Sequence, residues 1–509
     1  MYDVWQPALD LRMADDGRMS ILNSLYRPSL ALLTDLYELT MAYGYWKAGP
    51  PDREAVFHLI FRRSPFRGGF TVAAGLATAI DYLENSRFTA GDAAYLAGLR
   101  GNDGKPLFEP AFLDSLCALE PACDIDAVPE GTVVFPQEPL VRVRGPLLQA
   151  QLLETALLNI INFQTLIATK ASRLVLAAHG EPVLEFGLRR AQGIDGALSA
   201  SRAAYIGGCH ATSNVLAGQL FGIPVGGTHA HSWVMCHDDE LTAFREYARV
   251  MPNNCLFLVD TYDTLQGVRN AVTVGRELRK QGHEMIGIRL DSGDLASLSV
   301  EARQILDEAG FPQAAIVASN DLDERIIETL KDQHAKINIW GVGTRLVTGS
   351  DDPALGGVYK LSAVRRLGEP WQYKVKLSEQ TAKVSTPGIL QIRRFSSSAG
   401  TPLADAIIDE NARCDGRITI VDALDMTRRK TVPDGSAAED LLVPVFRGGR
   451  RVYDPPELLS IRCRAAEQLA AFPGGIKRFV NPHEYFVGLE RGLHERKTRL
   501  ILQERGFEH

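Results

Sequence analysis

Short apolar runs that alternate with helix-like segments are the feature that most constrains the fold of this chain. The runs are EPVLEFG, GIPVGGTHAH, CLFLVDTYD, EMIGIRLDSGD, AAIVASNDLD and INIWGVGT, and amphipathic text such as TLQGVRNAVTVGRELRKQG separates most of them. Buried strands that alternate with helices predict βαβ units and a parallel sheet. So many units favour an α/β fold with a TIM-like (β/α) barrel, regular or not, over an open doubly wound sheet.

The length of 509 residues predicts more than one compact core. We expect an N-terminal extension over residues 1–30, an N-terminal α+β domain over 31–150, the α/β-barrel catalytic domain over 151–367 and a C-terminal domain over 368–509. In the second of these, the run GTVVFPQEPLVRVRGP is typical of strands at a sheet edge, because prolines interrupt it.

Composition narrows the function classes. A net charge of −7 disfavours nucleic-acid binding. The first twenty residues lack the apolar core of a signal peptide. The most apolar run, LLQAQLLETALLNIINFQTLIATKA, contains Glu154 and several amides, so we expect a buried helix and no membrane span. Seven scattered cysteines without a CxxC pair favour reduced thiols, and we predict a cytoplasmic protein.

Polar residues follow the predicted strands, where the active site of a parallel barrel forms. Such a rim suits a phosphorylated sugar, because a Gly-x-Gly-Thr turn offers backbone N–H groups to phosphate, arginine donates in pairs, and carboxylates bind ribose hydroxyls or phosphate-bound magnesium. Each feature also has a structural reading, such as a tight turn, or an N-cap at Asp294, so their convergence carries the prediction. The rim residues are Arg189, Arg190, Asp260, Asp291, Ser292, Gly293, Asp294, Ser319, Asn320, Gly341, Gly343, Thr344 and Arg345.

The stretch GGTHAHSWVMCH raises a separate question about His229 and His231. Their spacing of two puts both on one face of an extended strand, as in the zinc sites of amidohydrolase-like barrels. A zinc site needs further ligands at the same rim, yet His283 and His334 precede their strands and should lie at the opposite end. His210 remains available, so a zinc-dependent hydrolase is kept as an alternative, beside ordinary packing of either histidine.

Seven motifs in order make the chain resemble the nicotinate phosphoribosyltransferases, of the type II phosphoribosyltransferase family. They are TDLYELTMA, FRRSPFRGGFTVAAGL, LLETALLNIINFQTLIATKASR, EFGLRRAQG, GTHAHSW, RLDSGDL and GVGTRLVTGS. The resemblance implies ATP-coupled synthesis of nicotinate mononucleotide from nicotinate and 5-phosphoribosyl 1-diphosphate, with release of diphosphate, as the first step of NAD biosynthesis from nicotinate. It also implies Mg²⁺ bound through substrate phosphates, with protein ligands unassigned, and a homodimer whose subunits share active sites.

The resemblance assigns roles to individual residues. It makes His231 the phosphohistidine, and we read His229 as accessory. It places Arg189, Arg190 and Asp291 in the catalytic centre. The nicotinate contacts are Tyr37, from the neighbouring subunit, Thr228 and Arg345. The sugar diphosphate contacts are Ser292, Gly293, Asp294, Gly341, Gly343, Thr344 and Ser385, the last preferred over Thr386.

Three rivals remain within reach of the sequence. Nicotinamide phosphoribosyltransferases place an acid in the segment that reads HATSN here, and Ser213 in its stead favours the acidic substrate. Quinolinate phosphoribosyltransferases are shorter and lack GTHAHSW. A non-catalytic descendant is disfavoured, because His231, Asp291 and Arg345 are all present.

Overall fold

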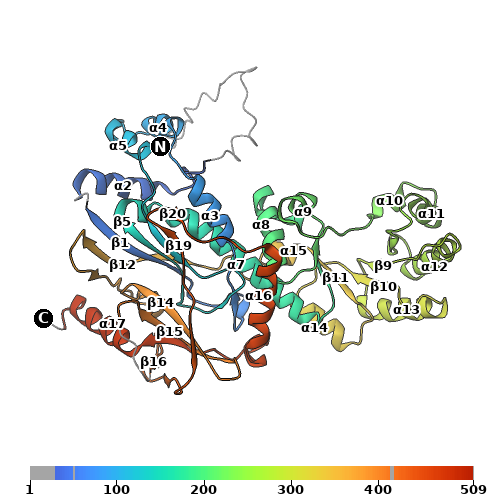
Figure 1. Cartoon of the computed structure of the whole chain (residues 1–509). Coiled ribbons are helices and arrows are strands. Elements are labelled where there is room, and N and C mark those ends of the chain that lie inside the picture. The colour runs from blue at the N-terminus through green and yellow to red at the C-terminus, as the bar shows by residue number, and fades with distance from the viewer. Residues whose placement is uncertain (1–28, 50–51, 413–417, 508–509) are drawn as a thin grey trace.

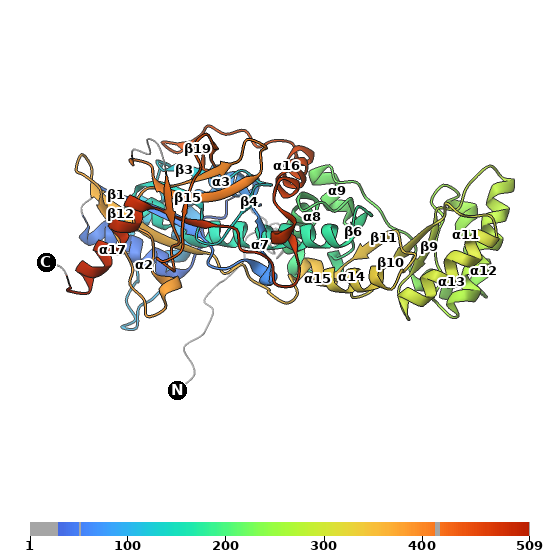
Figure 2. The ribbon, with the colours of Figure 1, turned by 90° about the horizontal axis from the view of Figure 1, so that it is seen from below.

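The computed structural model describes residues 29–49, 52–412 and 418–507, and the predicted extension over residues 1–30 falls almost wholly outside them. The described chain forms an elongated molecule (Figures 1 and 2). A parallel α/β layer with α10 (His231–Met235), α11 (Glu240–Val250) and α12 (Thr264–Lys280) occupies one end. Two largely antiparallel sheets, with α2 (Leu36–Ala48) and α17 (Arg491–Glu504), occupy the other end.

The parallel layer is a sheet with the order β7-β6-β11-β10-β9-β8. All its paired strands run parallel, as the alternation of strands and helices predicts. Each strand is short and mostly buried, because helices cover it. The strands are β6 (Val183–Glu185), β7 (Ala211–Thr212), β8 (Leu256–Leu258), β9 (Gly287–Leu290), β10 (Ala315–Ala318) and β11 (Ile339–Val342).

One extended segment links the two edges of this sheet. Val225 forms a parallel bridge with Thr212 at the β7 edge. A few residues later the Thr228 hydroxyl donates to the Leu256 carbonyl, and the Leu258 N–H donates to His229 Nε2 at 3.2 Å, both at the β8 edge. Side chains make this second connection, without a strand ladder. The fold is therefore mixed α/β, and a closed TIM-like barrel stays a prediction.

Aspartates at strand ends start several of the surrounding helices. Asp263, Asp294 and Asp323 accept hydrogen bonds from the first backbone N–H groups of the helices that follow them. Such N-caps satisfy donors that a helix leaves unpaired. The helices of this layer, besides α10 to α12, are α8 (Gly193–Ile206), α9 (Val215–Phe221), α13 (Leu295–Glu308), α14 (Glu324–Asp332) and α15 (Thr344–Val347).

The long helix α7 (Glu154–Ala177) is the core helix between the two ends of the molecule. Among the described residues, the stretch Leu147–Ala177 is the one with the length and apolar composition of a membrane span, and half of its most apolar window is buried. Lys170 and Arg173 of α7 are fully buried and pair with Glu324 at 2.7 Å and 2.8 Å. This buried ion cluster and the packing of α7 agree with the predicted core helix.

The seven-stranded sheet has the order β13-β12-β1-β5-β3-β19-β20 and combines strands from distant parts of the chain. Its strands are β1 (Arg53–Ile60), β3 (Asp124–Ala127), β5 (Pro139–Pro146), β12 (Val358–Arg366), β13 (Gln372–Tyr373), β19 (Val443–Arg447) and β20 (Arg450–Arg451). Strands on both sides of the predicted boundary at residue 367 thus share one sheet. The domain division itself stays a prediction.

The remaining elements cover this end of the molecule. A six-stranded sheet has the order β17-β16-β21-β15-β14-β18, and β2 pairs with β4. These strands are β14 (Leu390–Ser396), β15 (Pro402–Asp409), β16 (Thr419–Val421), β17 (Arg429–Thr431), β18 (Ala437–Asp440), β21 (Val487–Glu490), β2 (Thr71–Val72) and β4 (Val133–Val134). The helices are α3 (Leu76–Asn85), α4 (Ala90–Ala97), α5 (Pro110–Cys117), α6 (Leu147–Gln151) and α16 (Leu458–Ala471).

Candidate active site

His231 lies at the first position of α10, at the carboxyl ends of β8 and β9. Its Nδ1 is 3.1 Å from the Thr261 hydroxyl oxygen, and its Nε2 is 3.8 Å from Asp291 Oδ2. The imidazole is 39% exposed, so it is oriented from one side and open to a ligand on the other. An oriented neutral imidazole nitrogen facing solvent is suited to nucleophilic attack.

Asp291 belongs to a hydrogen-bonded network across three strand ends. Ser319, after β10, donates its hydroxyl to Asp291 Oδ1. Asp260, after β8, accepts from the Asp291 N–H at 3.0 Å and from the Ser292 hydroxyl at 2.6 Å. These bonds fix both carboxylates beside His231. Asp260 Oδ1 is buried and has no hydrogen-bond partner among the described residues.

Arg289 is a site residue that the sequence reading missed. It projects from β9, and burial lowers the pKa of its guanidinium, while the charges of Asp291 and Asp260 act in the opposite direction. Its Nε is buried without a hydrogen-bond partner among the described residues. An arginine inside an apparent strand text gave little signal, although it stands two positions before the Asp291 that the rim rule selected.

His229 serves the fold. It is 7% exposed, accepts from the Leu258 N–H through Nε2, and packs its ring 4.9 Å from the Tyr247 ring centroid. Burial lowers the pKa of His229 to about 4, so the ring is neutral near pH 7. The accessory reading of His229 therefore agrees with its environment, because its acceptor nitrogen is already occupied.

The Gly-x-Gly-Thr turn joins β11 to α15 and closes against Phe186. A Cβ at Gly341 would lie 2.8 Å from the Phe186 ring, and one at Gly343 would lie 3.0 Å from the Phe186 carbonyl oxygen. Thr344 is the first residue of α15, and Arg345 reaches Asp323 at 3.6 Å. The glycines thus let the chain approach a half-buried aromatic ring, which the sequence reading did not single out.

Other predicted rim residues lie on the same edge with different surroundings. Arg189 and Arg190 are exposed in a short 3-10 turn that follows β6, and Arg189 lies close enough to Arg289 to lower its pKa. Gly293 adopts a φ of 78°, which favours glycine. Asp294 is the N-cap of α13, where bonds to Ser297 lower its pKa. The capping alternative for Asp294 is therefore confirmed.

Tyr37 and Ser385 lie away from this edge within one chain. Tyr37 is on α2, at the opposite end of the molecule from α13 (Figure 2). Burial and nearby carboxylates raise its pKa to about 12. Ser385 lies between β13 and β14, is 4% exposed, and accepts from the Lys376 N–H at 2.8 Å. Thr386 accepts from the Lys497 ammonium at 3.2 Å.

The zinc alternative finds no support in the histidine positions. His210 precedes β7 and accepts from the Val183 N–H at 3.3 Å, so it lies at the amino ends of the strands. His283 and His334 precede β9 and β11, as the sequence predicts. Within residues 29–49, 52–412 and 418–507, no three His, Cys, Asp or Glu side chains are grouped to hold a metal ion.

Comparison with known proteins covers almost the whole chain. Residues 32–162 match the nicotinate phosphoribosyltransferase N-terminal domain, residues 182–374 the nicotinate phosphoribosyltransferase family, and residues 390–497 the corresponding C-terminal domain. A nicotinate phosphoribosyltransferase of Bacillus subtilis is 44% identical over 93% of this chain and 97% of that protein.

Solved structures show the same architecture. The crystal structure of human nicotinic acid phosphoribosyltransferase has a TM-score of 0.80 and 33% identity, and the match covers 92% of this chain and 99% of that one. A nicotinate-nucleotide pyrophosphorylase from Pyrococcus furiosus shares the fold, with a TM-score of 0.65 and 22% identity over 90% of this chain and 99% of that one.

Proposed function

Because the chain belongs to the nicotinate phosphoribosyltransferase family, we propose that it couples ATP hydrolysis to the synthesis of nicotinate mononucleotide through a phosphohistidine at His231. The substrates are nicotinate and 5-phosphoribosyl 1-diphosphate, and diphosphate is released. The observation that carries the ATP-coupled step is the half-exposed His231 imidazole, held by Thr261 and facing Asp291.

The phosphohistidine step uses Nε2 of His231. The Thr261 hydroxyl contacts Nδ1, so Nε2 is the nitrogen left to attack the γ-phosphorus of ATP. An N–P bond forms while the bond to the ADP oxygen breaks, and water later takes the phosphoryl group. Arginines beside the site, such as Arg289 and Arg189, offset the negative charge that accumulates on the phosphates.

The glycosyl transfer needs charge stabilisation more than a base. The nicotinate ring nitrogen attacks C1 of the sugar, and the bond from C1 to the diphosphate oxygen breaks. Arg189, Arg190 and Arg289 supply cations for the departing diphosphate. The oxygens of Asp260 and Asp291 fit Mg²⁺, a hard cation, and the unpartnered Asp260 Oδ1 supports this. When bound, Mg²⁺ would neutralise diphosphate charge.

The nicotinate pocket is formed around Phe186 and Arg345. The flat Phe186 ring at the β6 end offers a stacking surface for a pyridine, and the Arg345 guanidinium suits its carboxylate. Thr228 lies on the segment that precedes His231, and Ser213 follows β7 at the same edge. A neutral Ser213 leaves no negative charge against nicotinate, which favours the acid over nicotinamide.

Tyr37 and Ser385 reach this pocket only from a second subunit. Their distance from the site within one chain supports a homodimer in which α2 and the loop after β13 face the partner's parallel layer. A cytoplasmic location also remains part of this proposal.

The test is mononucleotide formation with nicotinate and nicotinamide in parallel, with sugar diphosphate and magnesium, with and without ATP. Wild type is expected to use nicotinate and to respond to ATP. His231→Ala is expected to keep a slow ATP-independent reaction. A preference for nicotinamide would overturn the base assignment, and an ATP response in His231→Ala would overturn the phosphohistidine assignment.

A further inference from the structure

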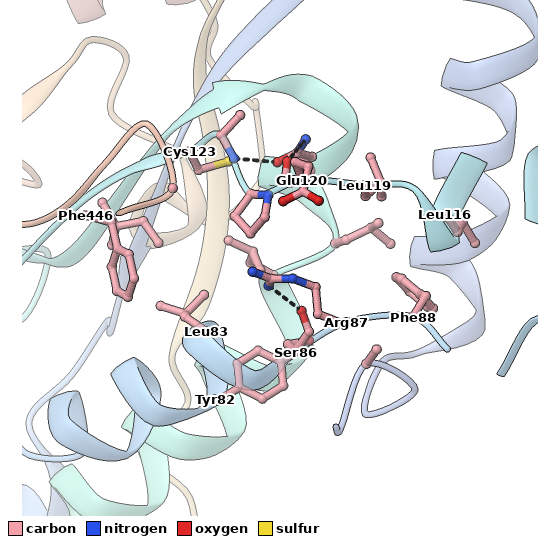
Figure 3. Close-up of a pocket in the computed structure, with 18 residues that line it drawn as sticks. Tyr82, Leu83, Ser86, Arg87, Phe88, Leu116, Leu119, Glu120, Cys123 and Phe446 are labelled. Atoms are coloured by element: carbon pink, nitrogen blue, oxygen red, sulfur yellow. Dashed lines mark hydrogen bonds between the residues drawn. The ribbon is translucent and has the colours of Figure 1, made fainter. Parts of the chain in front are cut away.

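A deep pocket lies at the far end of the molecule from His231, and no residue of the catalytic centre lines it. It encloses about 770 Å³ between the end of α3, the end of α5 and the turn that joins β19 to β20 (Figure 3). Volumes of this order are typical of small-molecule sites. Its walls include Tyr82, Leu83, Phe88, Leu116, Leu119 and Phe446.

The walls are preformed and mostly apolar. Leu116 is 2% exposed and Phe446 is 4% exposed, so their outer surfaces are packed into the core while another surface borders the pocket. Gln149 holds the α5 end in place, since it accepts from the Ala122 N–H and donates to the Glu120 carbonyl, both at 3.0 Å. An apolar hollow of this kind binds water poorly and favours an apolar ligand.

Two opposite charges enter this apolar pocket without pairing. The Arg87 side chain lies between Leu83 and Glu120 in Figure 3. Its Nη1 donates to the Ser86 carbonyl at 3.0 Å, and within the described parts of the chain no carboxylate lies within ion-pair distance of it. Its other donors are free for a planar acceptor, and a carboxylate matches that fork.

We propose that this pocket binds a small amphiphilic monocarboxylate, with its carboxylate on Arg87 and its hydrocarbon part against Leu83, Leu116 and Leu119. The Glu120 carboxylate on the facing wall disfavours a second negative charge, so a monoanion fits better than a polyphosphate. Because α3 and α5 lie at the opposite end from α10 to α12, bound carboxylate and nicotinate do not compete (Figure 1).

The experiment is isothermal titration of the full chain with octanoate, in the presence of saturating nicotinate so that Arg345 is occupied. We expect one site per chain. Each methylene added between hexanoate and decanoate should tighten binding about threefold, because it buries apolar surface. Octanol, which lacks the charge, should bind about tenfold more weakly.

Variants separate this pocket from other anion sites. Arg87→Gln should weaken octanoate about tenfold, and Leu83→Trp should block binding by filling the pocket. Glu120→Gln should bind octanoate at least as tightly as wild type. Arg100→Gln is the matched control, because Arg100 is also exposed and donates Nη1 to a backbone carbonyl, at Ala97, but lies outside the pocket.

Three results would overturn the proposal. They are equal binding of octanol and octanoate, unchanged affinity in Arg87→Gln, and the absence of saturable binding to the full chain, as when the chain's own N-terminal residues fill the pocket. Nicotinate turnover measured in each variant shows whether the catalytic end is intact, so failure here is distinguishable from failure of the proposed reaction.

Discussion

The Nδ1 atom of His231 lies 3.1 Å from the hydroxyl oxygen of Thr261. This contact comes from the turn that follows β8, whereas His231 begins a separate helix, so two elements must keep their relative positions for the ring to be oriented. The bond leaves Nε2 on the side of Asp291. Thr261 is thus a positioning residue for the proposed phosphohistidine.

Thr261→Val is expected to lower the ATP-stimulated rate about tenfold or more, because an unheld ring samples unproductive orientations. The rate without ATP should stay unchanged, since no phosphohistidine forms there. Thr261→Ser keeps the hydroxyl and is the control. The measurement is initial rate with and without ATP, and full stimulation in Thr261→Val would show that the contact has no role in the reaction.

Gly341→Ala is expected to raise the KM for nicotinate about tenfold, because the new Cβ would lie 2.8 Å from the Phe186 ring and displace the stacking surface. The KM for the sugar diphosphate should change less. Gly196→Ala is the matched control, because a Cβ there meets nothing within 4 Å. Equal effects on both KM values would argue against a pyridine site at Phe186.

Acidification should destabilise the protein through His229. Burial lowers the pKa of His229 to about 4 in the folded state, whereas an unfolded histidine titrates near 6.5. The unfolded chain therefore binds more protons between these values, and stability falls as the pH drops from about 6.5 to about 4, by up to about 3 kcal/mol.

The variant His229→Gln removes this titration. It should be less stable than wild type at pH 7, because Leu258 loses its acceptor, but its melting temperature should fall less between pH 7 and pH 5. Scanning calorimetry at both values checks this. Parallel losses in the two proteins would mean that His229 is not the titrating group.

Glu324→Gln is expected to destabilise the fold by about 3–5 kcal/mol, because it leaves two buried cations without an anion. Lys170 is 0% exposed and Arg173 is 1% exposed, so water cannot replace the carboxylate. Glu301→Gln, at an exposed position of α13, should change stability by less than about 0.5 kcal/mol. Urea unfolding of both variants provides the comparison, and similar midpoints would refute the role of the cluster.

Local sequence patterns were sufficient for the parallel layer. The runs around EMIGIRL, AAIVA and INIW form adjacent parallel strands, and Asp291, Ser319 and the Gly341 turn follow them on one edge. The reason is that strand burial and helix capping depend on nearby residues. Arg289 escaped the same logic, because a charged residue within an apolar run resembles a strand residue at the surface.

Long-range pairing could not be predicted in this way. Nothing in the text near β3 indicates that it pairs with β19 more than three hundred residues later in the sequence. The positions of Tyr37 and Ser385 depend on such pairings and on the placement of α2. Sequence motifs marked both residues, but no local rule relates them to the His231 edge.

The pairing of β1 with β12 also has a consequence for biosynthesis. At about 5–20 residues per second, the roughly 300 residues between these strands take a ribosome about 15–60 s to translate. During that interval β5 can cover one edge of β1, while the other edge is unpaired and prone to aggregation. The nascent chain therefore needs protection at β1 until synthesis passes residue 366, even though the whole parallel layer has emerged before then.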